Sequence, residues 1–184
     1  EYSFDKLIFT LNFAQLKNYF PKIETPSLQY LGAVNLVLAT SKPFLKDTYW
    51  LNINDRSFPF LAIVEHTNFI DKRHYGNQHL LYIGNYLPKE HKYFGYSAQN
   101  LLEEFMPYLK KINPQFNGNL VLNSWIFKAP FAQPVMTVGY HDVISSLKFK
   151  TPNLLVANMQ LVYPWDRGTN YAVQAGRLAA EDIV

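Results

Sequence analysis

Five histidines are the side chains of this sequence best suited to bind a metal ion, but their spacing does not suit that role. They are His66, His74, His79, His91 and His141. No two lie four residues apart on one helix face, and no His-Glu-x-x-His motif occurs. Zinc sites mostly use such histidine pairs or cysteines, and the sequence has no cysteine. Each histidine is therefore interpreted as a structural residue.

The motifs for covalent catalysis and for nucleotide binding are also missing. Ser97, in the run Gly95-Tyr-Ser-Ala-Gln99, resembles the nucleophile elbow of serine hydrolases, but Gln99 stands where that motif ends in glycine. Neither a Gly-x-Gly-x-x-Gly motif nor a P-loop occurs anywhere in the chain. We therefore expect no serine hydrolase, and no phosphate cradle built by this chain alone.

The C-terminal segment carries the residues best suited to contact a cofactor. Gly168 precedes a predicted helix over 169–183 and would let the backbone approach a ligand. The free N–H groups of Thr169, Asn170 and Tyr171 would then face an electron-rich group. Small residues recur along this helix at spacings of three and four, namely Ala172, Ala175, Gly176, Ala179 and Ala180. Such a stripe also suits plain packing against a sheet or another helix, so both interpretations stay open.

Aromatic side chains offer a second candidate site. The chain has 13 Tyr, 14 Phe and 3 Trp, which suits either a β-rich core or an aromatic cavity for an apolar or planar ligand. The candidates for a substrate pocket are Tyr49, Trp50, Tyr82, Tyr86 and Trp125. Each of them could equally belong to the core.

The elements that must position these residues are strands and three helices. Strand-like runs cover residues 2–11, 33–40, 48–53, 60–65, 79–87, 120–127 and 153–157. Short turns predict that the four runs between 33 and 87 pair antiparallel in succession. One helix follows Asn12, and a second follows Ser97 and is kinked or split by Pro107. The predicted fold is α+β: a mixed, largely antiparallel sheet with helices on one side and a C-terminal strand and helix.

The composition is that of a globular protein, with 48% hydrophobic residues in 184. The net charge is +3 and the basic residues are scattered, so no nucleic-acid binding is expected. The longest apolar stretch, 31–39, is too short to cross a bilayer, and no signal peptide is recognisable. We expect no membrane span and a cytoplasmic location, which the absence of cysteine also fits. A start at Glu1 rather than Met suggests a piece of a longer polypeptide.

Several segments occur in an order shared with one protein family. Asn153-Leu-Leu-Val-Ala157 and the helix Ala172-Val-Gln-Ala-Gly-Arg-Leu-Ala-Ala180 resemble the C-terminal signature of flavin-containing amine oxidases, protoporphyrinogen-oxidase-like proteins and the related UDP-galactopyranose mutases. The opening run with Asp5 is similar to a strand of that family, and Ala132-Gln-Pro-Val135 to its Ala-x-Pro segment. The resemblance covers nearly the whole chain, and its diagnostic part begins at residue 153.

The resemblance implies the fold and cofactor of an FAD-dependent oxidoreductase. In that family a Rossmann half holds the ADP part of FAD, a substrate domain covers the flavin, and the C-terminal helix points its N-terminus at the ring. Carried over by position, the FAD contacts are Arg167, Gly168, Thr169, Asn170 and Ala172. Residues 1–150 would form the substrate or cap domain, with 1–12 as a candidate strand of the FAD domain. Residues 151–184 would form the FAD-contacting strand and helix.

The glycine-rich half of that family is missing, so we expect a fragment that binds FAD weakly or not at all and is inactive alone. The expected partners are a small-molecule substrate, the missing Rossmann half and, as a candidate, a second copy in a homodimer. The parent enzyme would pass hydride from a C–N or C–C bond to FAD, or would use reduced flavin without net redox chemistry. The sequence indicates no catalytic acid or base. The alternative is a non-enzymatic module that binds a small ligand or a protein in an aromatic groove.

Overall fold

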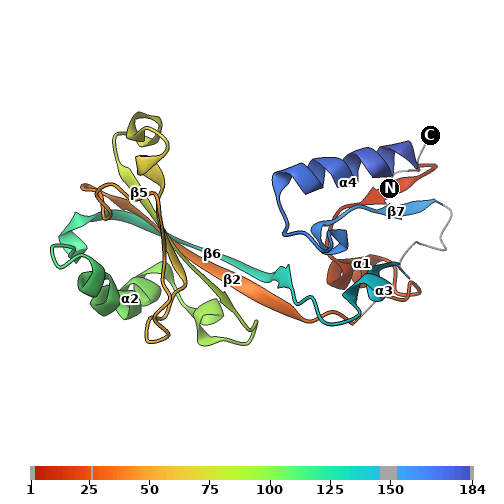
Figure 1. Ribbon diagram of the computed structural model, residues 1–184, viewed down its shortest axis with the longest axis horizontal. Coiled ribbons are helices and arrows are strands. Elements are labelled where there is room, and N and C mark those ends of the chain that lie inside the picture. The colour runs from red at the N-terminus through yellow and green to blue at the C-terminus, as the bar shows by residue number, and fades with distance from the viewer. Residues whose placement is uncertain (1–2, 26, 146–152, 183–184) are drawn as a thin grey trace. The chain divides into compact units, whose positions relative to one another are not determined.

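The computed structural model describes residues 3–25, 27–145 and 153–182. It divides into two compact units (Figure 1). The discontinuous unit combines Glu1–Gln29 with Pro134–Val184, and the sheet unit is Tyr30–Gln133. The domain boundary expected at residue 150 lies outside the described residues; the described segments on either side of it, 134–145 and 153–182, both belong to the discontinuous unit, in which the two ends of the chain pair in one small sheet.

The core of the discontinuous unit lies beside a two-stranded parallel sheet. Strand β1 (Leu7–Phe9) pairs with β7 (Leu154–Val156), with Leu7 opposite Leu154. Helix α1 (Phe13–Tyr19) begins as predicted after Asn12, whose side-chain oxygen accepts a hydrogen bond from the Gln15 backbone N–H at 2.9 Å. The unit also contains α3 (Tyr140–Ser145) and α4 (Thr169–Glu181). Its buried core residues are Phe9, Phe13, Leu16 and Leu154.

Hydrogen bonds from the loop after β7 join the two ends of the chain. The Phe13 backbone N–H donates to the side-chain oxygen of Gln160 at 2.8 Å, and the Tyr140 hydroxyl donates to the Gln160 carbonyl at 2.8 Å. The Asn158 amide donates to the Leu11 carbonyl at 2.8 Å. The bonds at Phe13 and at the Gln160 carbonyl are buried, so they satisfy backbone groups that water does not reach.

The sheet unit is built on five strands in the order β3-β4-β5-β2-β6. Their bounds are Tyr30–Thr40 (β2), Trp50–Asn52 (β3), Ala62–Glu65 (β4), His79–Leu87 (β5) and Val121–Pro134 (β6). Neighbours β3–β4 and β4–β5 pair antiparallel, as predicted. The prediction that β2 pairs with the next strand is wrong: β2 lies between β5 and β6. Its long apolar run matches β5 over nine residue pairs, a longer ladder than the three residues of β3 could provide.

Helix α2 (Ala98–Ile112) covers one face of this sheet (Figure 1). Its buried residues Leu101, Leu102, Phe105 and Leu109 pack in a core with alternate residues of β2, β4 and β5. Pro107 lies inside one continuous helix, so of the two expected outcomes, a kink or a division into two pieces, the division is wrong. Pro107 and Glu103, whose carbonyl loses its hydrogen bond, are both exposed, so water can serve that carbonyl while the buried face holds the helix together.

The opposite face of the sheet, here called the open face, carries the residues that alternate with the core positions. Val34, Leu36 and Leu38 of β2 are buried in the core with α2. Asn35 and its neighbours at positions 33 and 37 must therefore point to the open face. The predicted α+β fold, with a largely antiparallel sheet covered by helix on one side, is confirmed for this unit.

Candidate functional site

The residues expected to contact a cofactor are gathered at the start of α4. Gly168 is its N-cap, with an extended backbone and no side-chain cap. The N–H groups of Tyr171 and Ala172 both donate to the Gly168 carbonyl at 3.1 Å, while those of Thr169 and Asn170 have no partner within the helix. A Cβ on residue 168 would lie only 2.7 Å from the Asn170 side-chain oxygen, so glycine at this position avoids a clash with the Asn170 amide.

Arg167 precedes this turn, and its backbone N–H donates to the Asp166 carboxylate at 2.8 Å. Ala172 occupies the first turn of α4 and is exposed. A cavity of about 370 Å³ lies between β7 and α4, but none of the five expected contacts lines it. The five residues therefore share one helix end without enclosing a pocket among the residues that the structure describes, and their role as FAD contacts stays a prediction.

The small-residue stripe of α4 is mostly bare. Only Ala179 is buried, whereas Ala172, Gly176 and Ala180 are exposed. A Cβ on Gly176 would meet nothing within 4 Å. Glycine costs about 1 kcal/mol relative to alanine inside a helix, and packing within the described part of this chain does not account for it. Most of the stripe is thus left uncovered by the described residues.

The five aromatic candidates lie on the sheet unit rather than in its core. Tyr49, Trp50, Tyr82 and Tyr86 line a cavity of about 440 Å³, here called cavity A. Tyr82 and Trp125 line a neighbouring cavity of about 550 Å³, here called cavity B. None of the five belongs to the core under α2, and Trp50 is 54% exposed. The structure therefore brings the candidates together, and their role in substrate binding stays a prediction.

Asn35 is a site residue that the sequence did not single out. It lines both cavities, as Tyr82 does. Its side-chain oxygen is buried and accepts no hydrogen bond from the described residues. Gly84 faces it across the β2–β5 ladder, and a Cβ there would lie 3.2 Å from that oxygen. The sequence feature that could have indicated Asn35 is its position as a polar residue inside the apolar run 31–39.

His66 and Tyr75 form a second polar group at these cavities. Their side chains are joined by a hydrogen bond of 2.7 Å between His66 Nε2 and the Tyr75 hydroxyl. His66 lines cavity A and Tyr75 lines cavity B, and the His66 ring also packs against Tyr82, with centroids 5.5 Å apart. Burial, with smaller contributions from Tyr75 and Tyr49, raises the pKa of Tyr82, so its hydroxyl stays neutral.

Glu65 points away from His66, to the core side of the sheet, as expected for neighbours in a strand. Its carboxylate is fully buried and accepts hydrogen bonds from the Phe44 and Leu45 backbone N–H groups at 2.8 and 3.2 Å. The Thr67 hydroxyl donates to it at 3.0 Å. Burial raises the pKa of Glu65 above its usual value although these hydrogen bonds act to lower it. Glu65 therefore anchors the loop that leads to Tyr49 and does not reach the open face.

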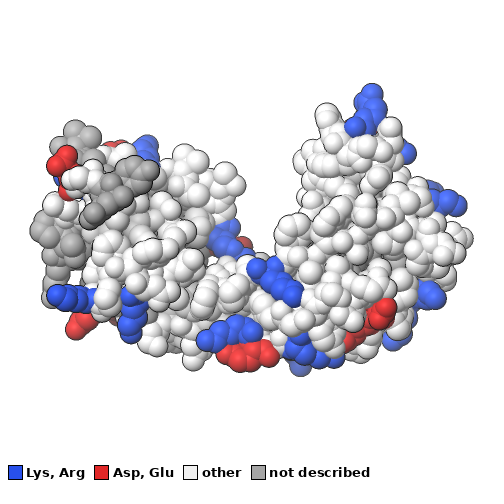
Figure 2. Space-filling model, turned by 180° about the vertical axis from the view of Figure 1, so that it is seen from behind, with Lys and Arg blue, Asp and Glu red and all other residues white. Residues whose placement is uncertain are grey.

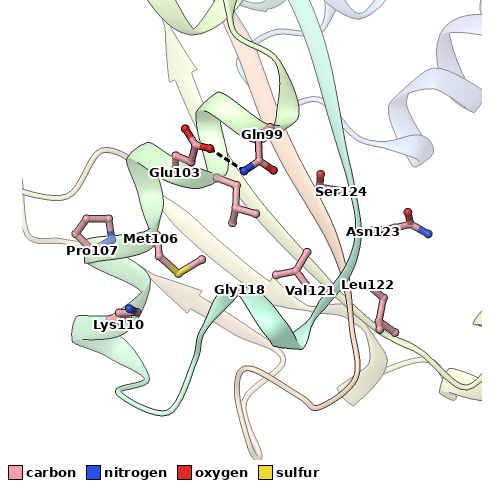
Figure 3. Close-up of a pocket in the computed structure, with 11 residues that line it drawn as sticks. Gln99, Glu103, Met106, Pro107, Lys110, Gly118, Val121, Leu122, Asn123 and Ser124 are labelled. Atoms are coloured by element: carbon pink, nitrogen blue, oxygen red, sulfur yellow. Dashed lines mark hydrogen bonds between the residues drawn. The ribbon is translucent and has the colours of Figure 1, made fainter.

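A third hollow runs between α2 and β6 (Figure 3). It has a volume of about 830 Å³ and is lined by Glu103, Met106 and Lys110 on the helix and by Val121 and Ser124 on the strand, among others. The Gln99 amide donates to Glu103 at 2.7 Å. Among the described residues, no histidine or aromatic side chain lines it. Its polar lining residues are Gln99, Glu103, Lys110, Asn123 and Ser124, so it offers hydrogen bonds and charge rather than aromatic surface.

The surface charge shows no dense patch on the face drawn in Figure 2, where Lys and Arg are spread among uncharged residues. Within the described ranges, no three His, Asp or Glu side chains gather as metal ligands would. None of the described helices is both long and apolar enough to cross a membrane.

Comparison with known proteins links this geometry to a cofactor. The sequence matches the family model of flavin-containing amine oxidoreductases over residues 1–184. No curated protein matches it.

Solved structures share the fold at low identity. A protein from Exiguobacterium sp. 255-15, provisionally assigned as a protoporphyrinogen oxidase, is 16% identical with a TM-score of 0.73, and the match covers 97% of this chain and 41% of that one. Reduced UDP-galactopyranose mutase is 15% identical with a TM-score of 0.73 over 99% of this chain and 42% of that one. A protein from Pyrococcus furiosus is 12% identical with a TM-score of 0.58 over 99% and 41%. This chain spans less than half the length of each.

Proposed function

Because this chain belongs to the family of flavin-containing amine oxidoreductases, we propose that it is the substrate-binding part and C-terminal flavin-contact segment of an FAD-dependent oxidoreductase. The observation that carries this proposal is the bare stripe of α4, next to a helix N-terminus that has no side-chain cap. The aromatic cavities of the sheet unit supply the substrate site.

The residues at the start of α4 fit a flavin ring. Gly168 carries no side chain, Thr169 and Asn170 are exposed, and their N–H groups have no partner within the helix. Bound there, FAD would supply the acceptor for a hydride from the substrate. The N-terminus of α4 carries partial positive charge, and it would stabilise negative charge on a group placed against it. Arg167 would add to this positive charge.

The stripe of α4 fits a close contact with the rest of the parent protein. Ala172, Gly176 and Ala180 are small and exposed, which lets another element or the cofactor approach the helix backbone. The structures that share this fold are more than twice as long as the chain, and we assign the binding of the ADP part of FAD to a glycine-rich half supplied by the parent. By itself this chain is expected to bind FAD weakly or not at all.

The substrate site of the proposed enzyme is the open face of the sheet unit. Tyr49, Trp50, Tyr82 and Trp125 line cavities A and B, which together offer aromatic surface to a small organic substrate. A non-enzymatic ligand-binding module would use the same cavities. Retention of flavin separates the two functions, because only the enzyme needs the bare stripe of α4 to be covered.

The test uses the full-length parent protein, purified with and without a substitution on α4. Gly176→Leu places a bulky side chain on the stripe, and it is expected to abolish copurification of flavin, measured by visible absorbance. Arg177→Leu is the matched control, because Arg177 is exposed and its guanidinium lies 3.7 Å from the exposed Glu181 carboxylate, a contact that contributes little. A parent without flavin, or a Gly176→Leu variant that keeps it, would contradict the proposal.

A further inference from the structure

We propose that cavities A and B form one site for an uncharged, flat aromatic ligand, and that Asn35 makes the hydrogen bond that orients it. If the proposed function holds, this ligand is the substrate of the enzyme, and only that identification rests on the proposed function. Binding itself can be measured on this chain without flavin.

The two cavities adjoin one another and share two of their lining residues. Asn35 of β2 and Tyr82 of β5 line both, and the His66–Tyr75 hydrogen bond joins a residue of one to a residue of the other. Volumes of about 440 and 550 Å³ each lie within the range of small-molecule sites. A ligand of two or three fused rings can therefore lie across Tyr82, with Trp50 on one side and Trp125 on the other.

The lining selects against charged ligands. No Lys, Arg, Asp or Glu is among the described residues that line cavity A or cavity B. A carboxylate or phosphate placed there would lose its water without gaining an opposite charge. Aromatic rings instead offer stacking and edge-to-face contacts to a flat ligand. The site thus suits a neutral aromatic compound rather than an acid or a nucleotide.

Asn35 supplies the polar contact because its side-chain oxygen is buried at both cavities without a hydrogen-bond partner among the described residues. His66 and Tyr75 hydrogen-bond to each other, whereas the Asn35 oxygen has no partner among the described residues. The amide lies over Gly84, where the absence of a Cβ gives it room. An N–H or O–H of the ligand would supply the missing hydrogen bond, and rotation of the amide would equally present its N–H₂ group to a ligand acceptor. Either contact fixes the ligand over the centre of the sheet.

The experiment follows the indole N–H signals of the protein by NMR while a probe is added. The chain has three tryptophans. Trp50 and Trp125 line the proposed site. Trp165 lines the separate cavity between β7 and α4 in the discontinuous unit, and its signal therefore reports any binding of the probe outside the proposed site. The probe is 2-naphthol, and the two charged comparisons are 2-naphthoate and 2-naphthylmethylammonium. We expect 2-naphthol to shift the Trp50 and Trp125 signals saturably, to leave Trp165 unchanged, and to bind at least tenfold more tightly than either ion.

Two variants test the role of Asn35. Asn35→Leu removes the amide at similar volume and should weaken 2-naphthol about tenfold, the effect of one lost hydrogen bond. Gly84→Ala, whose Cβ would press on the Asn35 oxygen, should weaken it several-fold while leaving the amide in the chain. Asn123→Leu is the control, since Asn123 is exposed and lines the separate hollow between α2 and β6.

The outcomes separate this inference from the proposed function. Equal or tighter binding of either ion would overturn the ligand class, and unchanged affinity in both Asn35→Leu and Gly84→Ala would overturn the role of Asn35. If one of these variants gives an undispersed spectrum, it is unfolded, and the role of Asn35 is then tested with the other variant. Absence of saturable shifts with 2-naphthol would refute the site itself. Flavin retention by the parent is measured separately, so either proposal can fail while the other stands.

Discussion

Replacing Glu65 by alanine is expected to cost the sheet unit about 3 kcal/mol of unfolding free energy. The carboxylate is fully buried, and its Oε2 accepts the Phe44 N–H at 2.8 Å and the Leu45 N–H at 3.2 Å. A buried donor left without an acceptor costs about 1–3 kcal/mol. The short, buried Phe44 bond accounts for about 2 kcal/mol and the longer, part-buried Leu45 bond for about 1 kcal/mol. The Thr67 hydroxyl adds little, because His79 Nδ1 lies 3.3 Å from it.

Glu65→Gln is the matched control for that loss. The glutamine carbonyl can accept both backbone N–H groups, and its N–H₂ group can donate to the Thr67 hydroxyl. We therefore expect it to cost about 1 kcal/mol or less near the acid end of the pH range. Urea denaturation followed by circular dichroism measures both variants against the parent chain. A Glu65→Ala variant less than 1 kcal/mol below wild type would refute the assignment of Glu65 as the anchor of this loop.

The pH dependence provides an independent check on the same residue. Burial raises the pKa of Glu65 above 4.5, so the folded state binds this proton more tightly than the unfolded state. The stability that protonation provides is full below pH 4.5 and is lost as the pH rises through the folded pKa. Glutamine stays neutral, so Glu65→Gln should gain stability relative to wild type over that rise. A difference that is flat or shrinks with rising pH would contradict the buried-carboxylate assignment.

Three further substitutions test the packing and capping of the fold. Gly32→Ala would push a Cβ into the Phe94 ring and to 3.1 Å from the Ala129 carbonyl, and it should lower the free energy of unfolding by about 1–3 kcal/mol, measured by thermal unfolding. Gly95→Ala is its control and should be close to neutral, because a Cβ there has nothing within 4 Å. Asn12→Ala removes the cap of α1 and should cost about 1 kcal/mol, and a loss below a few tenths would argue against that cap. Tyr93→Phe removes the 2.7 Å bond from the Tyr93 hydroxyl to Glu104 and should cost about 1 kcal/mol near neutral pH. Burial raises the pKa of Glu104, but hydrogen bonds from Lys92 and Tyr93 bring it below 4.5. The stability lost in Tyr93→Phe should therefore shrink as the pH falls through the folded pKa of Glu104. A loss that grows in acid would contradict this assignment.

Local sequence chemistry located most of the elements and indicated the family, although it gave other bounds for β1, β3 and β6 and did not predict α3. The run 79–87 is a strand with the predicted bounds, Asn12 and Ser97 cap the predicted helices, and α4 begins at Thr169 as expected. Periodicity and capping act over a few residues, so they can be judged without knowing the neighbours. The C-terminal signature likewise indicated the flavin-containing amine oxidoreductase family that the comparison confirms.

Tertiary structure alone decided that β2 lies between β5 and β6, and which side chains meet there. Alternation predicts that Asn35 and Val34 point to opposite faces, but not that β2 lies beside β5, which places Asn35 over Gly84. That pairing depends on contacts between residues far apart in the chain, and short-range patterns carry no information on them. The bare stripe of α4 is a second example. The sequence shows its small residues, but only the fold shows that the described chain leaves most of them uncovered.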